Sequence, residues 1–247
     1  MYFFERHNIK RKNKFVFNGN DLSNIVVVES IKRQLLPQIQ NNAIYIPGKI
    51  GREFQSNNLD LRVITLTLRF IEDTYEDVQK KITELAGHLY TKEPKKLELY
   101  DTDLFNYAII SQALELQKIN STGSCELIFE CYDPLNYGET KTAVLEEESI
   151  ISINGTYPIS GIINLTTKQS DYFKITLNDG LFIQLDTMIN ANQNIIIDLN
   201  EQKITVNGNL IQDKINLNSD FFKLVPGNNK ITIYGATGNI VYNEGWI

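Results

Sequence analysis

The sequence predicts a mainly β protein made of two β-sandwich domains, with one packed α-helix in the first. Residues 61–70 alternate between apolar and polar side chains, which is typical of a half-buried antiparallel strand. Residues 74–89 carry the one convincing amphipathic helix pattern of the chain. After residue 150 the chain consists of short strand-like runs separated by turn pairs, which indicates an antiparallel sandwich.

The composition is that of a globular protein, with 42% hydrophobic and 22% charged residues over 247 positions. A formal net charge of −6 provides no general attraction to nucleic acid, so no specific nucleic-acid binding is expected. No apolar run approaches the ~20 residues that a membrane helix needs. The first seven residues place aromatic side chains before charged ones, the reverse of a secretory signal, so we expect synthesis in the cytosol.

The first elements are a basic segment and two short strands. Residues 5–14 contain six basic side chains with little apolar support, which suggests a solvated arm or, alternatively, a nucleic-acid contact. Phe15–Phe17 is expected to be a strand that ends in an Asn-Gly turn. Residues 25–28 are apolar throughout and predict a second strand, covered on both faces.

From residue 31 to residue 53 the periodicity is lost, and two prolines and two glycines lie among large apolar side chains. Apolar residues beside such turns must be covered, and a neighbouring subunit is one candidate. We therefore predict that residues 34–54 reach onto a neighbouring copy as a belt that turns at Pro47 and Gly48. The predicted subunit interface comprises Leu35, Leu36, Ile39, Ile44, Tyr45, Ile46, Pro47, Gly48 and Ile50.

The alternating strand at residues 61–70 leads directly into the helix. Asp73 or Thr74 is expected to cap the helix, with acidic residues in its first turn, and Pro94 marks its end. One stripe of the helix is apolar and should cover a sheet, and it consists of Val78, Ile82, Leu85, Ala86 and Leu89. Further strands are expected at residues 96–100, 107–110, 114–119 and 124–132.

Cys125 and Cys131 are the only cysteines and fall on one expected strand. Six residues apart on a strand, they lie ~20 Å from each other, too far for a disulfide. We expect both to fill the core rather than to serve a redox or metal site.

Turn residues at positions 133–138 and an acidic run at Glu146–Glu148 predict a domain boundary between about 138 and 150. The predicted domains are residues 1–140 and 141–247. The second is expected to contain strands at residues 150–153, 158–165, 172–177, 181–185, 194–199, 203–206, 220–225, 230–234 and 238–242.

No catalytic constellation is visible. His7 and His88, the only histidines, have no metal ligands at suitable spacing, and no nucleophile elbow or phosphate-binding glycine loop occurs. Glu146–Glu148 could attract a cation, but successive acidic residues are more often a solvated linker. We therefore expect no enzyme activity, no catalytic or metal residues and no cofactor.

Four segments together resemble the distal tail proteins of siphophages. They are the Pro-Gly turn in residues 46–51, the strand and helix in residues 61–90, the Asp-Pro-x-x-Tyr segment in residues 130–138, and the Leu-x-Pro-Gly-x-Asn segment in residues 222–231. The resemblance implies a tail-tube-like first domain that forms a hexameric ring, and a galectin-like second domain.

The same resemblance implies a structural virion protein at the tail tip, which joins the tail tube to the tip or baseplate. The implied partners are further copies of the chain, the major tail tube protein, a tail-associated or tip protein and, where attached, receptor-binding proteins. The chain has no obvious insertion in its second domain that would form an arm to grip a receptor-binding protein. The alternative function is that of a carbohydrate-binding module for host recognition, although Trp246, the only tryptophan, is poorly placed to line a sugar site.

Overall fold

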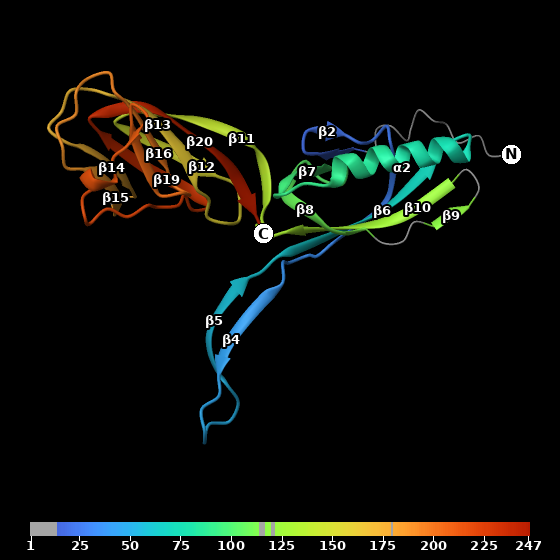
Figure 1. Ribbon diagram of the computed structural model, residues 1–247. Helices are drawn as coiled ribbons and strands as arrows, with labels where there is room; N and C mark the ends of the chain where they lie inside the picture. The colour runs from blue at the N-terminus through green and yellow to red at the C-terminus, as the bar shows by residue number, and fades with distance from the viewer. Residues whose placement is uncertain (1–13, 114–116, 120–121, 179) are drawn as a thin grey trace. The chain divides into compact units, whose positions relative to one another are not determined.

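The computed structural model describes residues 14–113, 117–119, 122–178 and 180–247 (Figure 1). The chain divides into two compact units, the first ending at Asn136 and the second running from Tyr137 to Trp246. The architecture is mainly β with a single α-helix among the described residues, which confirms the predicted fold class. The basic residues 5–13 lie outside the described part of the chain.

The first unit is built on an antiparallel sheet in the order β2-β1-β7-β8-β10-β6-β3, with β9 beside β10. A separate pair, β4 and β5, leaves this sheet as a hairpin (Figure 1). The strands are β1 (Phe15–Phe17), β2 (Asn20–Asp21), β3 (Val27–Arg33), β4 (Ile39–Ile44), β5 (Glu53–Leu59), β6 (Arg62–Ile71), β7 (Lys95–Leu99), β8 (Phe105–Ala113), β9 (Gln117–Ile119) and β10 (Thr122–Cys131).

The alternation of β6 puts one face of the strand in the core, as predicted. Ile64, Leu66, Leu68 and Phe70 are buried, and β6 pairs with β10 on one side and β3 on the other. Phe129 of β10 meets the rings of Phe15 and Phe17 in the same core, at centroid distances of 6.5 and 5.3 Å. These aromatic contacts join β1 to β10.

Helix α2 (Tyr75–Leu89) covers this core. The Thr74 hydroxyl accepts a hydrogen bond from the Asp77 amide, so Thr74 is the cap, and acidic residues occupy the first turn. Val78, Leu85 and Leu89 are buried and Ile82 packs beside them, but Ala86 is exposed. The predicted apolar stripe therefore contained one residue too many. The side chain of Ala86 is a single methyl group, which is small enough to lie at the solvent-facing border of the helix.

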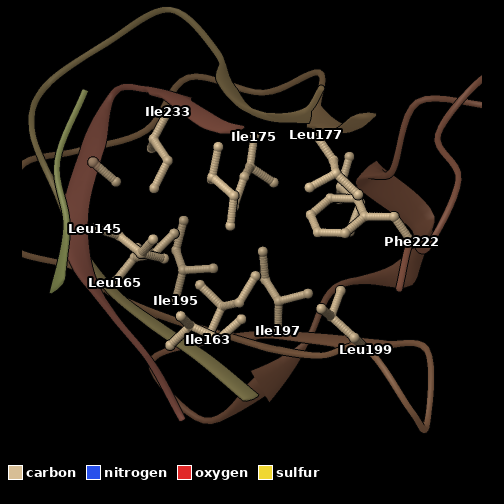
Figure 2. Packing of buried hydrophobic residues seen from close by; sticks show 14 of the residues in the cluster. Leu145, Ile163, Leu165, Ile175, Leu177, Ile195, Ile197, Leu199, Phe222 and Ile233 are labelled. Carbon is tan, nitrogen blue, oxygen red and sulfur yellow. The ribbon is translucent and has the colours of Figure 1, made fainter. Parts of the chain in front are cut away.

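The second unit consists of two antiparallel sheets with an apolar core between them (Figure 2). One sheet has the order β18-β17-β16-β13-β20-β11, and the other β12-β19-β14-β15. The strands are β11 (Asn136–Leu145), β12 (Glu148–Ile153), β13 (Gly161–Thr167), β14 (Phe173–Leu177), β15 (Leu181–Leu185), β16 (Asn194–Asp198), β17 (Lys203–Val206), β18 (Asn209–Leu210), β19 (Gly227–Tyr234) and β20 (Ala236–Trp246), and η2 (Gln212–Lys214) is a short 3-10 helix.

Side chains from both sheets interdigitate in this core (Figure 2). Leu165 and Ile197 come from one sheet, while Ile175 and Ile233 come from the other. The Asn207-Gly208 turn joins β17 to β18 with φ values of +51° and +81°, as the hairpin signal predicted.

The structure differs from the sequence predictions in three segments. Residues 31–53, where the periodicity is lost, contain the end of β3, all of β4 and the first residue of β5. Residues 138–145, at the start of the predicted boundary region, belong to strand β11. Residues 220–225 form no strand, although Phe222 and Leu224 are buried and Leu224 makes one bridge with Ile159. No helix in the described residues has the length and apolar character of a membrane span.

Candidate assembly surface

The hairpin formed by β4 and β5 is the most exposed part of the first unit, and here it is called the arm (residues 34–60). Figure 1 shows the arm running away from the sheet of its own unit. The two strands pair only with each other, from Ile39 opposite Leu59 to Ile44 opposite Glu53. Every residue of the two strands except Leu59 is exposed. The two strands of the arm therefore have no core face within their own chain.

A tight turn closes the tip of the arm. The Lys49 amide donates to the Ile46 carbonyl at 3.1 Å, and Gly48 has a φ of +86°. A positive φ at the third position of a turn requires glycine, and proline fits the second position, which explains the Pro47-Gly48 pair. Lys49 Nζ also lies 2.7 Å from Glu53 Oε2 across the tip.

All the apolar residues predicted to form a subunit interface lie on the arm and are exposed. Leu35 is 92% exposed near the base, and Ile50 is 101% exposed at the tip. The structure adds Phe54 of β5, which is 61% exposed and extends the apolar cluster of the tip. The tip cluster, defined here, comprises Ile44, Tyr45, Ile46, Ile50 and Phe54.

The middle of the arm is polar but uncharged. Gln40, Asn41 and Asn42 of β4 lie opposite Asn58, Asn57 and Ser56 of β5. Asn42 Nδ2 donates to Ser56 Oγ at 3.1 Å, and Gln40 Nε2 donates to Asp60 Oδ2 at 3.0 Å. These cross-strand bonds fix the register of a ribbon that has no core face to fix it.

The base of the arm is held by Arg62, which is only 3% exposed. Its Nε donates to the Pro134 carbonyl and its Nη1 to the Gln34 carbonyl, both at 2.8 Å. The Gln34 side chain in turn accepts from the Val63 amide at 3.2 Å. Burial lowers the pKa of Arg62, yet the guanidinium stays charged because its ordinary pKa is far above neutrality.

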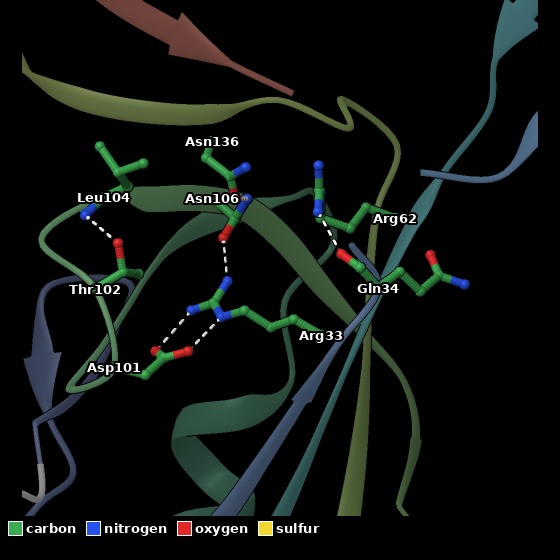
Figure 3. Close-up of polar contacts among 8 residues, drawn as sticks. All are labelled: Arg33, Gln34, Arg62, Asp101, Thr102, Leu104, Asn106 and Asn136. Atoms are coloured by element: carbon green, nitrogen blue, oxygen red, sulfur yellow. Dashed lines mark hydrogen bonds and ion pairs between the residues drawn. The ribbon is translucent and has the colours of Figure 1, made fainter. Parts of the chain in front are cut away.

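A second arginine secures the strand that enters the arm (Figure 3). Arg33 donates to both carboxylate oxygens of Asp101, at 2.7 and 3.0 Å, and to Asn106 Oδ1 at 2.9 Å. Asn106 is buried and donates onward to the Leu135 carbonyl and to Asn136 Oδ1, both at 3.0 Å. Bidentate arginine–carboxylate pairs fix orientation as well as position. The two arginines therefore set where the arm leaves the sheet.

The other residues singled out in the sequence have structural positions. His88 is partly buried on α2, while His7 lies outside the described residues. Cys131 is buried, Cys125 is partly buried against the same core, and both thiols are free. Within the described part of the chain, no three His, Cys, Asp or Glu side chains are grouped to hold a metal ion.

The last residue of the Leu-x-Pro-Gly-x-Asn segment, Asn229, stabilises a turn in the second unit. Asn229 is fully buried, and its Nδ2 donates to the carbonyls of Val225 and Gly227 at 2.7 and 3.1 Å. Its Oδ1 accepts from the Val225 amide at 2.9 Å. One side chain thus bonds three backbone groups of the turn that leads into β19.

Two domain families match the chain. Residues 20–131 match the phage tail protein RIFT-related domain, and residues 154–246 match the C-terminal domain of the siphovirus-type tail component. The distal tail protein of Bacillus phage SPP1 is 23% identical over 238 residues, which cover 93% of this chain and 94% of that protein.

Solved structures share the fold. The crystal structure of the SPP1 Dit protein, described as a paradigm of hub adsorption apparatus in phages that infect Gram-positive bacteria, superposes with a TM-score of 0.83 at 19% identity. The match covers 95% of this chain and 99% of that one. A chain of the phage P2 baseplate in its activated conformation with Ca matches with a TM-score of 0.53 at 10% identity, over 91% and 92% of the two chains.

Proposed function

We propose, from the premise that this chain is a distal tail protein of the siphophage type, that its copies close into a hexameric ring at the end of the tail tube. The ring joins the major tail tube protein on one side to a tail-associated or tip protein on the other. Receptor-binding proteins of the baseplate attach to this hub. The location is the tail tip of the virion, in keeping with the tail and baseplate relatives.

The exposed arm is the observation that supports the ring. Its tip cluster presents five large apolar side chains that their own chain leaves exposed. Burying each one against a partner contributes roughly 1.5–3 kcal/mol before the costs of association. A contact in which the arm binds a different part of the neighbouring chain is head-to-tail, and repeated rotation closes such contacts into a ring.

The two units have different tasks in this proposal. The first unit carries the arm and forms the ring, while the second, proposed to be galectin-like, hangs from the ring. Its separate apolar core supports this division, because that core contains no residue of the first unit.

A serine-substituted arm tests the proposal. Wild-type chain is expected to sediment as a hexamer and to show a ring with a central channel in electron micrographs. Replacing Ile44, Tyr45 and Ile46 together with serine should shift the mass toward the monomer without unfolding the chain. The matched control replaces Met188, Leu210 and Leu217, which are exposed apolar residues of the second unit, and should leave the assembly intact.

Trypsin supplies an independent readout, because Lys49 and Arg52 lie at the tip of the arm. Cleavage after these residues should be fast in the monomeric variant and slow in the assembled wild type. A triple variant that keeps the wild-type mass, or one that loses the circular dichroism of the fold, would contradict the assignment of the arm as the ring contact.

A further inference from the structure

Asparagine is followed by glycine at three places in the chain, at Asn18, Asn154 and Asn207. In such a pair the backbone nitrogen of the glycine can attack the side-chain carbonyl carbon of the asparagine, because glycine has no Cβ to hinder the approach. The reaction converts asparagine into aspartate and needs no enzyme or cofactor. Its rate in a folded protein depends on how the fold holds the two residues.

The fold blocks this reaction at Asn154. Gly155 is buried, and a Cβ placed on it would lie 2.4 Å from the Gly245 carbonyl oxygen. The Asn154 amide donates to Glu244 Oε1 at 2.9 Å. On the other side of the pair, the Thr156 amide donates to the Gly245 carbonyl, also at 2.9 Å. The glycine nitrogen is therefore held on both sides and cannot move toward the asparagine side chain.

The pairs at Asn18 and Asn207 form two exposed turns with nearly the same backbone. Both asparagines have a φ of +51°, and Gly19 and Gly208 have φ values of +77° and +81°. A Cβ placed on either glycine would meet no described atom within 4 Å beyond its chain neighbours. Among the described residues, no turn or loop hydrogen bond uses either glycine amide. Both glycine nitrogens are therefore available for the attack.

The two asparagine side chains differ in what they bind. The Asn194 amide donates to Asn207 Oδ1 at 2.9 Å, and the Asn207 amide donates to the Asn194 carbonyl at 2.8 Å. The side-chain carbonyl of Asn207 is thus held by the first residue of β16. In the described part of the chain, Asn18 is hydrogen-bonded through its backbone atoms only. Asn18 therefore serves as an internal comparison for Asn207.

A donor at Oδ1 favours the attack, because negative charge develops on that oxygen. The Gly208 nitrogen gives its proton to solvent base and bonds to Asn207 Cγ, which places the charge of the tetrahedral intermediate on Oδ1. Hydrogen bonds to a charged acceptor are about twice as strong as neutral ones. The Asn194 N–H therefore stabilises the intermediate more than it stabilises the starting amide.

The products follow from the collapse of this intermediate. The bond between Cγ and Nδ2 of Asn207 breaks, Nδ2 takes up a proton and leaves as ammonia, and a five-membered succinimide ring remains. Water then adds to one of the two ring carbonyls and opens the ring. Opening at Cγ gives aspartate, and opening at the backbone carbonyl gives isoaspartate, in which the main chain runs through the side chain.

We propose that Asn207 is a self-modifying residue, which converts to aspartate and isoaspartate while Asn18 and Asn154 convert slowly. This inference concerns the second unit alone and is independent of the proposed ring. Each event adds a negative charge to a chain whose formal net charge is already −6. Isoaspartate also lengthens the backbone of the two-residue turn between β17 and β18, so this turn should change as the protein ages.

Mass spectrometry of the full-length chain tests the proposal. After incubation in mildly alkaline buffer, trypsin separates the three pairs into different peptides, and each conversion is seen as the exchange of ammonia for water. We expect Asn207 to convert about tenfold faster than Asn18, less than one donor achieves in a closed active site because the turn is exposed to water. Asn154 should stay intact. In urea, where the fold is lost, all three should convert at similar rates.

A matched pair of substitutions at Asn194 isolates the donor. Asn194→Pro removes the N–H at the first position of a strand, where proline is tolerated, whereas Asn194→Ala keeps it. Asn194→Pro should slow Asn207 to the rate of Asn18, and Asn194→Ala should leave Asn207 at the wild-type rate. Equal rates at Asn207 and Asn18 in the folded wild type, or an unchanged rate in Asn194→Pro, would overturn the proposal. If Asn194→Pro does not fold, the comparison of folded and urea-treated wild type decides.

Discussion

Arg62 and Pro134 are 72 positions apart in the sequence, yet the guanidinium Nε of Arg62 donates a 2.8 Å hydrogen bond to the Pro134 carbonyl. The same side chain binds the Gln34 carbonyl, so one buried charge connects the start of the arm, the start of β6 and the segment after β10. Buried charges that satisfy backbone carbonyls are costly to remove, because the carbonyls are left without partners.

Replacing Arg62 should therefore destabilise the first unit. Arg62→Ala is expected to lower the free energy of unfolding by about 2–4 kcal/mol, since two hydrogen bonds from a charged donor are lost in a buried place. Arg69→Ala is the matched control on the same strand, where a half-exposed pair with Glu29 contributes about 0–1 kcal/mol. Urea unfolding curves of the two variants measure the difference, and equal losses would contradict the role of Arg62.

Asn229 should matter far more than its neighbour Asn228. Asn229→Ala leaves the turn before β19 without its buried donor and acceptor, so we expect a loss of about 2–3 kcal/mol from the second unit. Asn228 is exposed, and Asn228→Ala should change the stability by less than about 0.5 kcal/mol. Chemical denaturation followed by Trp246 fluorescence measures both, and similar values would refute the assignment.

Glu244 should make the stability of the second unit depend on pH. Burial raises the pKa of Glu244, but hydrogen bonds from the Asn154 amide and from Lys141 outweigh burial and leave that pKa below its usual value. A lowered pKa means that the stabilisation is complete above the unfolded-state pKa of about 4.3 and is lost as the pH falls from there through the folded-state pKa. Glu244→Gln should flatten this acid dependence in melting curves recorded from pH 6 to pH 3. An unchanged slope would show that Glu244 is not the titrating group.

The two units should unfold separately, and each contains its own probe. Burial raises the pKa of the Cys131 thiol to about 12, so Cys131 of the first unit should react with an alkylating reagent at pH 8 only after that unit opens. Trp246, the only tryptophan, reports on the second unit. In a urea series we expect the two probes to give different midpoints. Coincident transitions with equal slopes would argue for one cooperative unit.

The second unit should bind no simple sugar appreciably. Tyr172 and Tyr234 are its most suitable aromatic pair, but they stack on each other at a centroid distance of 4.6 Å with an interplanar angle of 19°. Each ring therefore covers one face of the other, which leaves at most one face of each ring for a sugar. A glycan array is expected to show no saturable signal. Saturable binding that disappears in Tyr234→Ser would revive the carbohydrate-binding alternative.

Elements with a buried face were predictable from the sequence, and elements without one were not. The alternation of β6 and the apolar stripe of α2 could be predicted because burial against a core requires apolar side chains at regular positions. Ile64, Leu66, Val78 and Leu85 are such positions. The strands of the arm show no alternation of apolar and polar residues. Both of their faces are exposed to solvent, so neither face requires apolar side chains.

The remaining errors have similar physical causes. Most residues of β11 from Gly138 to Val144 are exposed or polar, so no strand was predicted there. Phe222 and Leu224 gave residues 220–225 a strand-like pattern, although they enter the core from irregular backbone. The apolar residues of the predicted interface are exposed on the arm, and their role as an interface stays a prediction. Arg62 and Arg33, which hold the arm, carried no local signal because their partners are distant in the sequence.

The exposed apolar tip of the arm also has a consequence for the time between synthesis and incorporation. A free copy displays five large apolar side chains, so a misfolded chain with exposed apolar surface competes with the correct neighbour for them. In the proposed ring, only closure covers the tips of all arms together. We therefore expect slow assembly at high concentration to favour precipitation over intact tails.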